Sequence, residues 1–450
     1  MKFDVVTAEI GSTTTVVSAF VGLGSTPKLV AQSEHYTTVN EGDVTIGIER
    51  ALKFMKEKIG ESIDWENLLV SSSAAGGLKM TVHGLVYDMT ARAAKEAALG
   101  AGGVVKLVTS GKISSDVLNK VRLISPKLIL LAGGVDHGES ETVIHNAEIF
   151  AQSDISVPFV YAGNSDASER VEEILENAGK KVTVTENVYP KVDLLNVEPV
   201  RKIVQRVFSQ HIIHAPGMTK LDGQIKGQII PTPAAVMKAG SILQKEMGDC
   251  MVIDIGGATT DVDSFTSGSP DIQEITISPE PFAKRTVEGD LGVFVNAANV
   301  VKVFDWIREE FPDEEELLKK ITPYPSDKRI ENFVLAMAKG CATESVLRHS
   351  GRIRYIYGST GRIRLAEGKD LTAIVNIFGT GGVLSRSRGS SRILDEVRKL
   401  GQKKPMFLLP PKESKLYVDS NYIFAACGLI AQIDEESAKK LLNGDVKRVG

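Results

Sequence analysis

The chain has 450 residues, of which 42% are hydrophobic and 24% are charged, a composition typical of a soluble globular protein with two or three domains. Its formal net charge of −4, from 53 basic and 57 acidic residues, argues against nucleic acid or an anionic membrane as a partner. The isolated cysteines Cys250, Cys341 and Cys427 argue against a disulfide scaffold or an iron–sulfur cluster and indicate reduced thiols in the cytoplasm. Because Asp4 and Glu9 flank the first short apolar run, and no apolar stretch could span a bilayer, we expect neither a signal peptide nor a membrane span.

The chain begins with three predicted strands, Phe3–Ile10, Thr15–Val21 and Leu29–Ser33, which form a meander. The turn between the first two strands combines an acid, a glycine and a cluster of hydroxyls: Glu9, Gly11, Ser12, Thr13 and Thr14. Taken alone, this turn fits a phosphate-binding loop and an ordinary hairpin equally well.

The region that follows alternates between predicted helices and strands. Glu41–Ile59 has helical spacing, and a strand over 68–73 leads through a small-residue turn to a return strand, Leu78–His83. The strand Lys127–Leu131 enters a glycine turn and then a helix, which could hold an anion or be a plain connection. The alternation predicts a largely parallel, helix-covered sheet that starts with the meander.

A boundary falls near Pro231, because the stretch around it is rich in proline and glycine. We therefore expect a first lobe over 1–230 and a second lobe over 231–450, joined by a helix over 234–245. Just before this stretch, His211 and His214 have a spacing that could pair two imidazoles on a metal. No third ligand lies nearby, so the sequence favours two structural histidines.

The second lobe opens with the clearest motif of the chain, a buried strand that enters a double-glycine turn and returns as a second strand. Its polar and glycine residues are Asp254, Gly256, Gly257, Ala258, Thr259, Thr260 and Asp261. The glycines let the backbone approach a phosphate, and the backbone N–H groups and threonine hydroxyls can donate to its oxygens. Two carboxylates beside phosphates are a usual way to hold partly hydrated Mg²⁺. The alternative is a hairpin with a polar tip, which needs neither two acids nor a threonine pair.

Three later stretches each have two interpretations. Pro279–Gly292 is predicted to be irregular and could line a cleft, with Lys284 or Arg285 near phosphate, or be a solvated loop. Residues 351–364 predict a hairpin with a basic face, which could bind a partner or only face solvent. A strand over 373–378 enters a glycine turn, and such a turn could pack its backbone against an adenine or simply join a strand to a helix. The residues of this last turn are Gly379, Thr380, Gly381 and Gly382.

The paired acid–x–Gly–hydroxyl loops resemble those of the actin, sugar kinase and Hsp70 ATPase superfamily. Over essentially its full length the chain more closely resembles the MutL family associated with glutamate mutase, also called GlmL, which is distinct from the DNA mismatch-repair protein of the same name. The stretches that carry this resemblance are Ala8–Thr14, Ser72–Leu78, Leu131–Gly138, Asp254–Asp261 and Arg285–Gly292.

The resemblance implies an α/β fold with two actin-like lobes, each a ribonuclease H-like mixed sheet with helices on both faces. It also implies a cytoplasmic ATP-binding protein that acts as a chaperone or reactivase for an adenosylcobalamin-dependent mutase of the glutamate mutase or aminomutase type. In such a site, Glu9, Asp254 and Asp261 would bind Mg²⁺ and position water, and the first two glycine turns would bind the phosphates of ATP. The turn at Gly379–Gly382 would face the adenosine.

Two departures from the superfamily pattern point to slow turnover, or to ATP binding with little hydrolysis. The first turn has Glu9 where the superfamily usually has aspartate, and no lysine or arginine follows within that turn. A small-molecule kinase and a filament-forming actin-like protein are the alternatives on the same fold, although the sequence shows no acceptor pocket for a kinase. The sequence leaves room for a homodimer.

Overall fold

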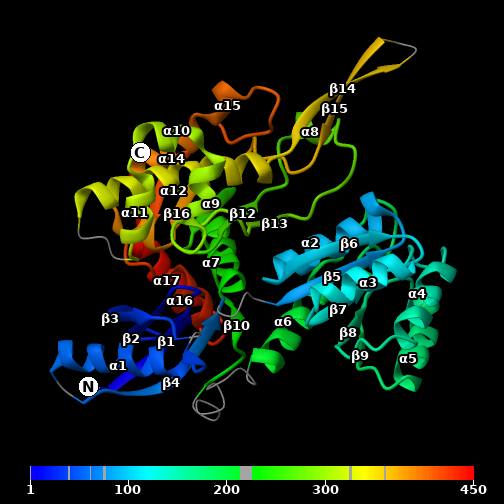
Figure 1. Cartoon of the computed structure of the whole chain (residues 1–450), viewed down its shortest axis with the longest axis horizontal. Helices are drawn as coiled ribbons and strands as arrows, with labels where there is room; N and C mark the ends of the chain where they lie inside the picture. Colours follow the sequence, from blue (N-terminus) through cyan, green and yellow to red (C-terminus); the bar gives the residue numbers. More distant parts are fainter. Residues whose placement is uncertain are drawn as a thin grey trace. The chain divides into compact units, whose positions relative to one another are not determined.

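The computed structural model describes residues 2–38, 41–60, 62–73, 78–212, 225–323, 327–358 and 361–450. The chain forms two compact units (Figure 1). The first unit contains residues 1–75, 213–277 and 282–450, and the second contains residues 76–212 and 278–281. Both predicted phosphate loops belong to the first unit, so the division into lobes at residue 231 stays a prediction.

The first sheet of the first unit has the strand order β10-β4-β1-β2-β3. Its strands are β1 (Lys2–Ile10), β2 (Thr14–Val21), β3 (Lys28–Tyr36), β4 (Asp64–Ser72) and β10 (Ile230–Pro231). The first three form the predicted antiparallel meander, and β4 and β10 continue the sheet in parallel to β1. Helix α1 (Thr45–Ile59) packs on β2 and β3 through Ile48, Ala51 and Met55, whose spacing places them on one helical face.

The second sheet has the strand order β13-β12-β11-β16-β17-β18. Its strands are β11 (Cys250–Ile255), β12 (Thr260–Phe265), β13 (Ala283–Glu288), β16 (Asn376–Thr380), β17 (Lys415–Asp419) and β18 (Val446–Arg448). Strands β11 to β13 form an antiparallel meander, and β16 and β17 follow in parallel to β11. Its first five strands repeat the order and directions of the first sheet. This repetition confirms the predicted fold of two ribonuclease H-like mixed sheets.

Two helices lie between these sheets. Helices α7 (Thr232–Met247) and α16 (Phe424–Ile430) share one buried core with Phe20 of the first sheet and Phe378 of the second. They approach closely at Gly428, where α16 has no side chain. A Cβ atom on Gly428 would lie 1.9 Å from the backbone oxygen of Ala235. This layer ties together the two sheets that carry the predicted phosphate loops.

The outer face of the second sheet is covered by a core that includes α9 (Ala297–Val303), α12 (Lys328–His349) and α14 (Ser390–Arg398). Shorter helices surround this core, and β14 (Arg352–Gly358) pairs with β15 (Gly361–Glu367) in a separate two-stranded sheet. The shorter helices are α10 (Asp305–Glu310), α11 (Glu314–Lys320), α13 (Gly382–Arg386) and α15 (Leu400–Lys403). Helix α8 (Pro270–Gln273) contributes Ile272 to a separate small cluster, and α17 (Glu435–Asp445) packs on α7 and α16 in the core between the two sheets.

The second unit has a five-stranded sheet of its own, in which all strands are parallel and the order is β6-β5-β7-β8-β9. This is the doubly wound order of flavodoxin-like sheets. Its strands are β5 (Lys79–Gly84), β6 (Val104–Ser110), β7 (Leu128–Leu131), β8 (Phe159–Tyr161) and β9 (Val182–Val184). Its helices are η3 (Tyr87–Ala91), α2 (Arg92–Gly100), α3 (Ser115–Ile124), α4 (Glu141–Ala151), η4 (Ser165–Ala167), α5 (Ser168–Asn177) and α6 (Glu198–Ile212).

Two sequence expectations about this region were wrong. The parallel strands do not continue the meander, since they form a separate sheet, and β5 does not return beside β4. The sequence also gave no signal for β6, whose residues are mostly only half-buried. The predicted turn at 74–77 and His214 lie outside the described residues.

The stretch Pro279–Gly292 was wrongly expected to be irregular, because β13 is a regular strand paired with β12. Lys284 and Arg285 are 2% and 1% exposed, so neither belongs to a solvated loop. Among the described residues, none of the helices is both long and apolar enough to cross a membrane.

Candidate functional site

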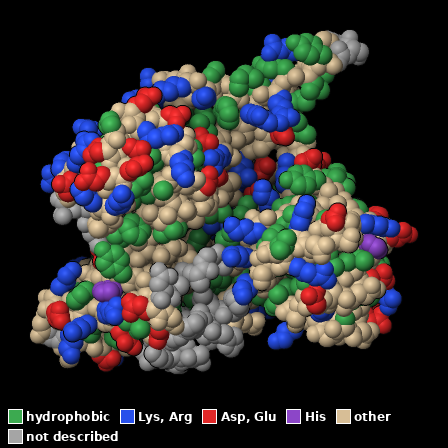
Figure 2. Space-filling view, in the orientation of Figure 1, with side chains coloured by type: hydrophobic (Ala, Val, Ile, Leu, Met, Phe, Trp, Pro, Cys, Tyr) green, Lys and Arg blue, Asp and Glu red, His purple; other side chains and the backbone are tan. Residues whose placement is uncertain are grey.

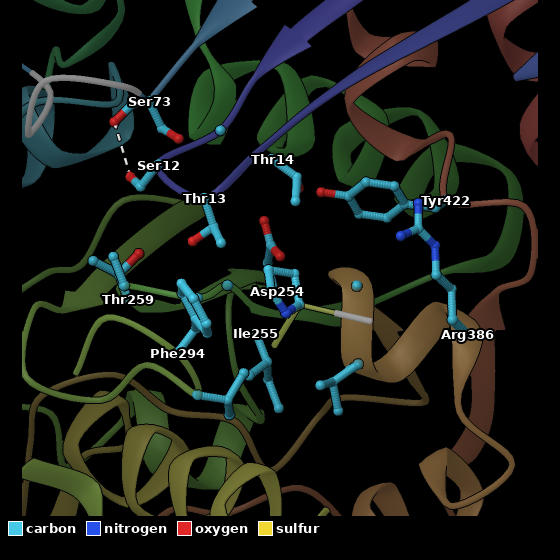
Figure 3. A pocket seen from close by; sticks show the side chains of 18 of the residues that line it. Ser12, Thr13, Thr14, Ser73, Asp254, Ile255, Thr259, Phe294, Arg386 and Tyr422 are labelled. Atoms are coloured by element: carbon cyan, nitrogen blue, oxygen red, sulfur yellow. Dashed lines mark hydrogen bonds between the residues drawn. The ribbon is translucent and has the colours of Figure 1, made fainter. Parts of the chain in front are cut away.

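A cavity of about 380 Å³ opens in the first unit, between the glycine turns of its two sheets (Figure 3). Its volume lies in the range typical of small-molecule sites. Most of the predicted site residues line it: Glu9, Gly11, Ser12, Thr13, Thr14, Asp254, Gly256, Gly257, Ala258, Thr259, Asp261 and Gly382. The structure therefore brings together two turns that lie far apart in the sequence.

The first glycine loop, Gly11–Thr14, is a tight turn between β1 and β2. The N–H of Gly11 donates to the oxygen of Thr14 at 2.9 Å, and a Cβ atom on Gly11 would lie 2.7 Å from that oxygen. The Ser12 hydroxyl donates to the backbone oxygen of Ser73 at 3.2 Å (Figure 3). The Thr13 Oγ1 atom is buried at the cavity wall and has no hydrogen-bond partner within the described structure. A buried hydroxyl without a partner is a rare feature that a ligand oxygen would satisfy.

The second glycine loop, Gly256–Thr259, repeats this geometry between β11 and β12. The N–H of Gly256 donates to the oxygen of Thr259 at 2.9 Å, as in the first loop. A Cβ atom on Gly257 would lie 2.2 Å from Thr13 Oγ1, so the two loops approach each other at a place where a side chain does not fit. The backbone oxygen of Gly257 accepts from the N–H groups of Phe294 and Val295. The segment after β13 thus holds the loop in place.

The carboxylate of Asp254 points from the second sheet toward the first glycine loop (Figure 3). Burial raises its pKa well above the usual range, and the negative charges of Asp261 and Glu9 raise it further. Burial also raises the pKa of Glu9 to about 7, against the opposing effect of a hydrogen bond from Tyr422. These carboxylates therefore need either protons or a cation to be accommodated.

Asp261 is in a different environment. The Arg285 guanidinium pairs with Asp261 Oδ1, at 2.8 Å from Nε and 2.5 Å from Nη2, and both side chains are buried. The Asp261 Oδ2 atom accepts a hydrogen bond from Thr259 Oγ1 at 3.2 Å. The charge of Asp261 is thus balanced by Arg285, and its second oxygen orients the Thr259 hydroxyl of the second glycine loop.

No group of three or more histidine, cysteine, aspartate or glutamate side chains within the described ranges is arranged to hold a metal ion. Mg²⁺ does not require such a group, because it usually keeps several waters and binds through one or two carboxylates and the phosphates of a substrate. Asp254, which lines the cavity and is not the partner of Arg285, fits that role best. The binding of Mg²⁺ by Glu9, Asp254 and Asp261 stays a prediction.

Four predicted site residues lie outside the cavity wall. Thr260 Oγ1 donates to the backbone oxygen of Leu291, and Thr380 Oγ1 donates to Asp419 Oδ2 at 2.7 Å. The other two are Gly379, which packs against leucine side chains, and Gly381. Gly381 has a φ of 90°, and a Cβ atom there would lie 2.4 Å from the backbone oxygen of Ile255. Of this third glycine loop, Gly379–Gly382, only Gly382 reaches the cavity.

One wall of the cavity, to which α12 contributes, was not predicted from the sequence. Its residues come from the start of that helix and from the segments around it: Phe294, Thr322, Pro323, Glu331, Val334, Leu335 and Val383. Most are apolar, so this wall suits the flat apolar part of a ligand while the glycine loops suit its anionic part. In sequence, Val334 and Leu335 look like ordinary residues of an amphipathic helix.

Tyr422 and Arg386 were also missed, although both line the cavity (Figure 3). The Tyr422 hydroxyl donates to Glu9 Oε1 at 2.9 Å. Tyr422 has a φ of 54°, the left-handed conformation that a tyrosine rarely adopts. The Arg386 guanidinium lies 5.3 Å from the centre of the Tyr422 ring and pairs with Glu34. A residue 413 positions away supports Glu9, and no local pattern in the sequence could have indicated it.

Comparison with known proteins identifies the relatives of this chain. The family model described as MutL protein matches residues 5–446. The chain is 38% identical over 435 residues to protein MutL of Clostridium tetanomorphum, a match that covers 92% of this chain and 93% of the relative.

Several solved structures align with most of this chain, at low sequence identity and low TM-score. Nucleotide-free acetone carboxylase aligns with a TM-score of 0.39 at 11% identity, covering 95% of this chain and 70% of that one. Diol dehydratase-reactivating factor in its nucleotide-free form aligns with a TM-score of 0.36 at 12% identity, covering 97% and 100%. Xylulose kinase from Bifidobacterium adolescentis aligns with a TM-score of 0.31 at 12% identity, covering 99% and 94%. TM-scores this low carry no information about function.

Proposed function

Since this chain belongs to the MutL protein family, we propose that it is a cytoplasmic ATP-binding protein that slowly hydrolyses ATP and assists or reactivates an adenosylcobalamin-dependent mutase of the glutamate mutase or aminomutase type. The observation that carries the ATP part is the approach of Gly257 to Thr13, which places two glycine loops against one cavity. The mutase part rests on the family resemblance. A small-molecule kinase and a filament-forming protein share the fold, and no feature of the described residues favours either.

Two groups of cavity residues would contact different parts of ATP, one the phosphates and the other the adenine ring. The loops Gly11–Thr14 and Gly256–Thr259 supply backbone N–H groups and hydroxyls for the phosphates, in the manner of anion-binding nests. The apolar wall at Val334, Leu335 and Val383 suits the adenine ring. Mg²⁺, when bound, would supply charge compensation for the phosphates and for Asp254.

We assign to Glu9, whose side chain lines the cavity, the role of taking a proton from an attacking water. Its pKa of about 7 keeps it partly deprotonated near neutral pH, which is the condition for an effective general base. The Tyr422 hydroxyl fixes the orientation of its carboxylate. Arg285 holds Asp261 so that Asp261 orients Thr259 rather than competing for the same proton.

The test is titration calorimetry of Mg²⁺–ATP against the wild type and two variants, Asp254→Ala and Gly257→Val. We expect both variants to lose measurable binding, because the first removes the central carboxylate and the second places a side chain where 2.2 Å is available. Gly444→Ala is the matched control, since a Cβ atom on Gly444 would meet no neighbouring atom within 4 Å.

Binding of ATP by both variants, with the affinity of the wild type, would remove the two-loop cavity as the nucleotide site. A folded wild-type protein that binds no ATP would overturn the ATPase proposal as a whole. The mutase part is tested separately, by adding the protein and ATP to a mutase inactivated during turnover and measuring the recovery of activity.

A further inference from the structure

The β14–β15 hairpin extends away from the rest of the first unit as a two-stranded sheet (Figure 1). The contacts of its described residues with the rest of the unit lie near its base. There, Ile353 and Ala366 join a small buried cluster with Ile272 and Leu408, and the Ala366 N–H donates to the oxygen of Ile275 at 2.8 Å. A free-standing two-stranded hairpin is only marginally stable in water. A binding partner that covers the arm would stabilise it.

Beyond the base, the hairpin exposes large apolar side chains on both faces. Ile356 and Ile363 lie opposite each other across the strands and are 48% and 39% exposed. Side chains of a strand alternate between faces, so Tyr355 and Tyr357 lie on the other face, where they are 38% and 83% exposed. Figure 2 shows hydrophobic and basic side chains gathered along this arm.

The arm is also strongly basic. It carries Arg352, Arg354, Arg362 and Arg364 against the single acid Glu367, a net charge of 4 − 1 = +3 in a chain whose net charge is −4. Arg354 pairs with Glu367 at 2.6 Å. Arg362 and Arg364 lie opposite Tyr357 and Tyr355, and the Arg362 guanidinium stacks on the Tyr355 ring at 3.4 Å from its centre.

We propose that six described side chains of the arm, Tyr355, Ile356, Tyr357, Arg362, Ile363 and Arg364, are the docking site for an acidic, partly apolar region of the mutase; the identity of this partner rests on the proposed function. Tyrosine and arginine are the side chains that most often supply binding energy at protein interfaces, and stacking on an aromatic ring pre-organises a guanidinium for carboxylate binding. The isoleucine pair requires an apolar contact on the same partner. Because the cavity is lined by other residues, docking and ATP binding use separate surfaces.

Two other roles explain less of what is observed. Arginines on an exposed hairpin discourage edge-to-edge aggregation, but that role does not require two exposed isoleucines and two exposed tyrosines. A nucleic acid would contact the arginine–tyrosine face through its phosphates and bases, yet it offers nothing to cover the Ile356–Ile363 pair on the opposite face. A protein groove that closes around the arm contacts both faces, with acidic side chains against the arginine–tyrosine face and apolar side chains against the Ile356–Ile363 pair.

The test measures binding of purified glutamate mutase, and of a purified adenosylcobalamin-dependent aminomutase, to the immobilised full-length protein by interferometry. The variant is Arg362→Glu/Arg364→Glu, and a second variant, Ile356→Ser, probes the apolar face. The control is Lys106→Glu/Lys120→Glu, the same change of charge at two exposed lysines of the second unit. Mg²⁺–ATP calorimetry on each protein shows that the fold and the cavity are intact.

We expect the arginine variant to bind the mutase about 10-fold to 100-fold more weakly, Ile356→Ser to weaken binding as well, and the control and all ATP affinities to be unchanged. Wild-type affinity for the mutase in both hairpin variants would overturn the docking proposal and leave the proposed function standing. A wild type that binds ATP but no mutase would overturn the mutase as partner and the docking proposal with it. Retention of a DNA duplex by the arm in place of the mutase would assign the surface to nucleic acid and contradict the proposal.

Discussion

At the scale of single residues, burial and the hydrogen bond from Tyr422 act in opposite directions on the pKa of Glu9. The hydrogen bond from the Tyr422 hydroxyl stabilises the charged form of Glu9 and lowers its pKa, while burial raises that pKa to about 7. Removal of the hydroxyl therefore raises the pKa of Glu9 further. If Glu9 must be deprotonated to accept a proton from water, ATP hydrolysis increases as the pH rises through this pKa.

We predict that Tyr422→Phe moves the acidic limb of the pH–rate profile for ATP hydrolysis to higher pH and slows turnover at pH 7. The measurement is phosphate release between pH 5.5 and 9 at saturating Mg²⁺–ATP. Tyr87→Phe is the control, because Tyr87 is 54% exposed in the second unit and does not line the cavity. A limb that stays in place in Tyr422→Phe would show that Glu9 is not the titrating group.

At the scale of helices and strands, the close packing of α7 and α16 holds together the layer between the two sheets. A Cβ atom on Gly428 would overlap the backbone of α7 at Ala235, and backbone atoms cannot move aside as a flexible side chain can. We predict that Gly428→Ala destabilises the protein by about 1–3 kcal/mol, the usual range for overpacking. The measurement is denaturant unfolding beside Gly444→Ala, where the added methyl meets open space. Equal stability of the two variants would mean that the helices can separate without penalty.

Helices, strands and loops differ in how well a local sequence pattern predicts them. The glycine loops were found because an acid, glycines and hydroxyls within a few residues form a local pattern, and both loops line the cavity. Lys284 and Arg285 were misjudged because charged residues are usually exposed. Their burial depends on a neighbouring strand, where Asp261 provides the partner for Arg285. The contributions of Tyr422 and Val334 depend on tertiary contacts, which a local pattern does not record.

For the whole molecule, the main feature is that every residue of the cavity belongs to the first unit, although the second unit is inserted into it along the chain. A ligand that binds only the folded first unit stabilises that unit by mass action. The second unit has its own sheet and its own core, which includes Ile129, Phe150 and Tyr161. We therefore predict two calorimetric unfolding transitions, of which Mg²⁺–ATP raises the temperature of only one.

The expected stabilisation is about 2.7 kcal/mol when ATP is present at 100 times its dissociation constant. Differential scanning calorimetry with and without Mg²⁺–ATP measures it, and Asp254→Ala provides the control in which neither transition moves. Limited proteolysis at a temperature between the two transitions identifies the unit that each one represents. If both transitions move together with ATP, the nucleotide couples the two units, and the second unit becomes the part of the molecule through which ATP binding is transmitted.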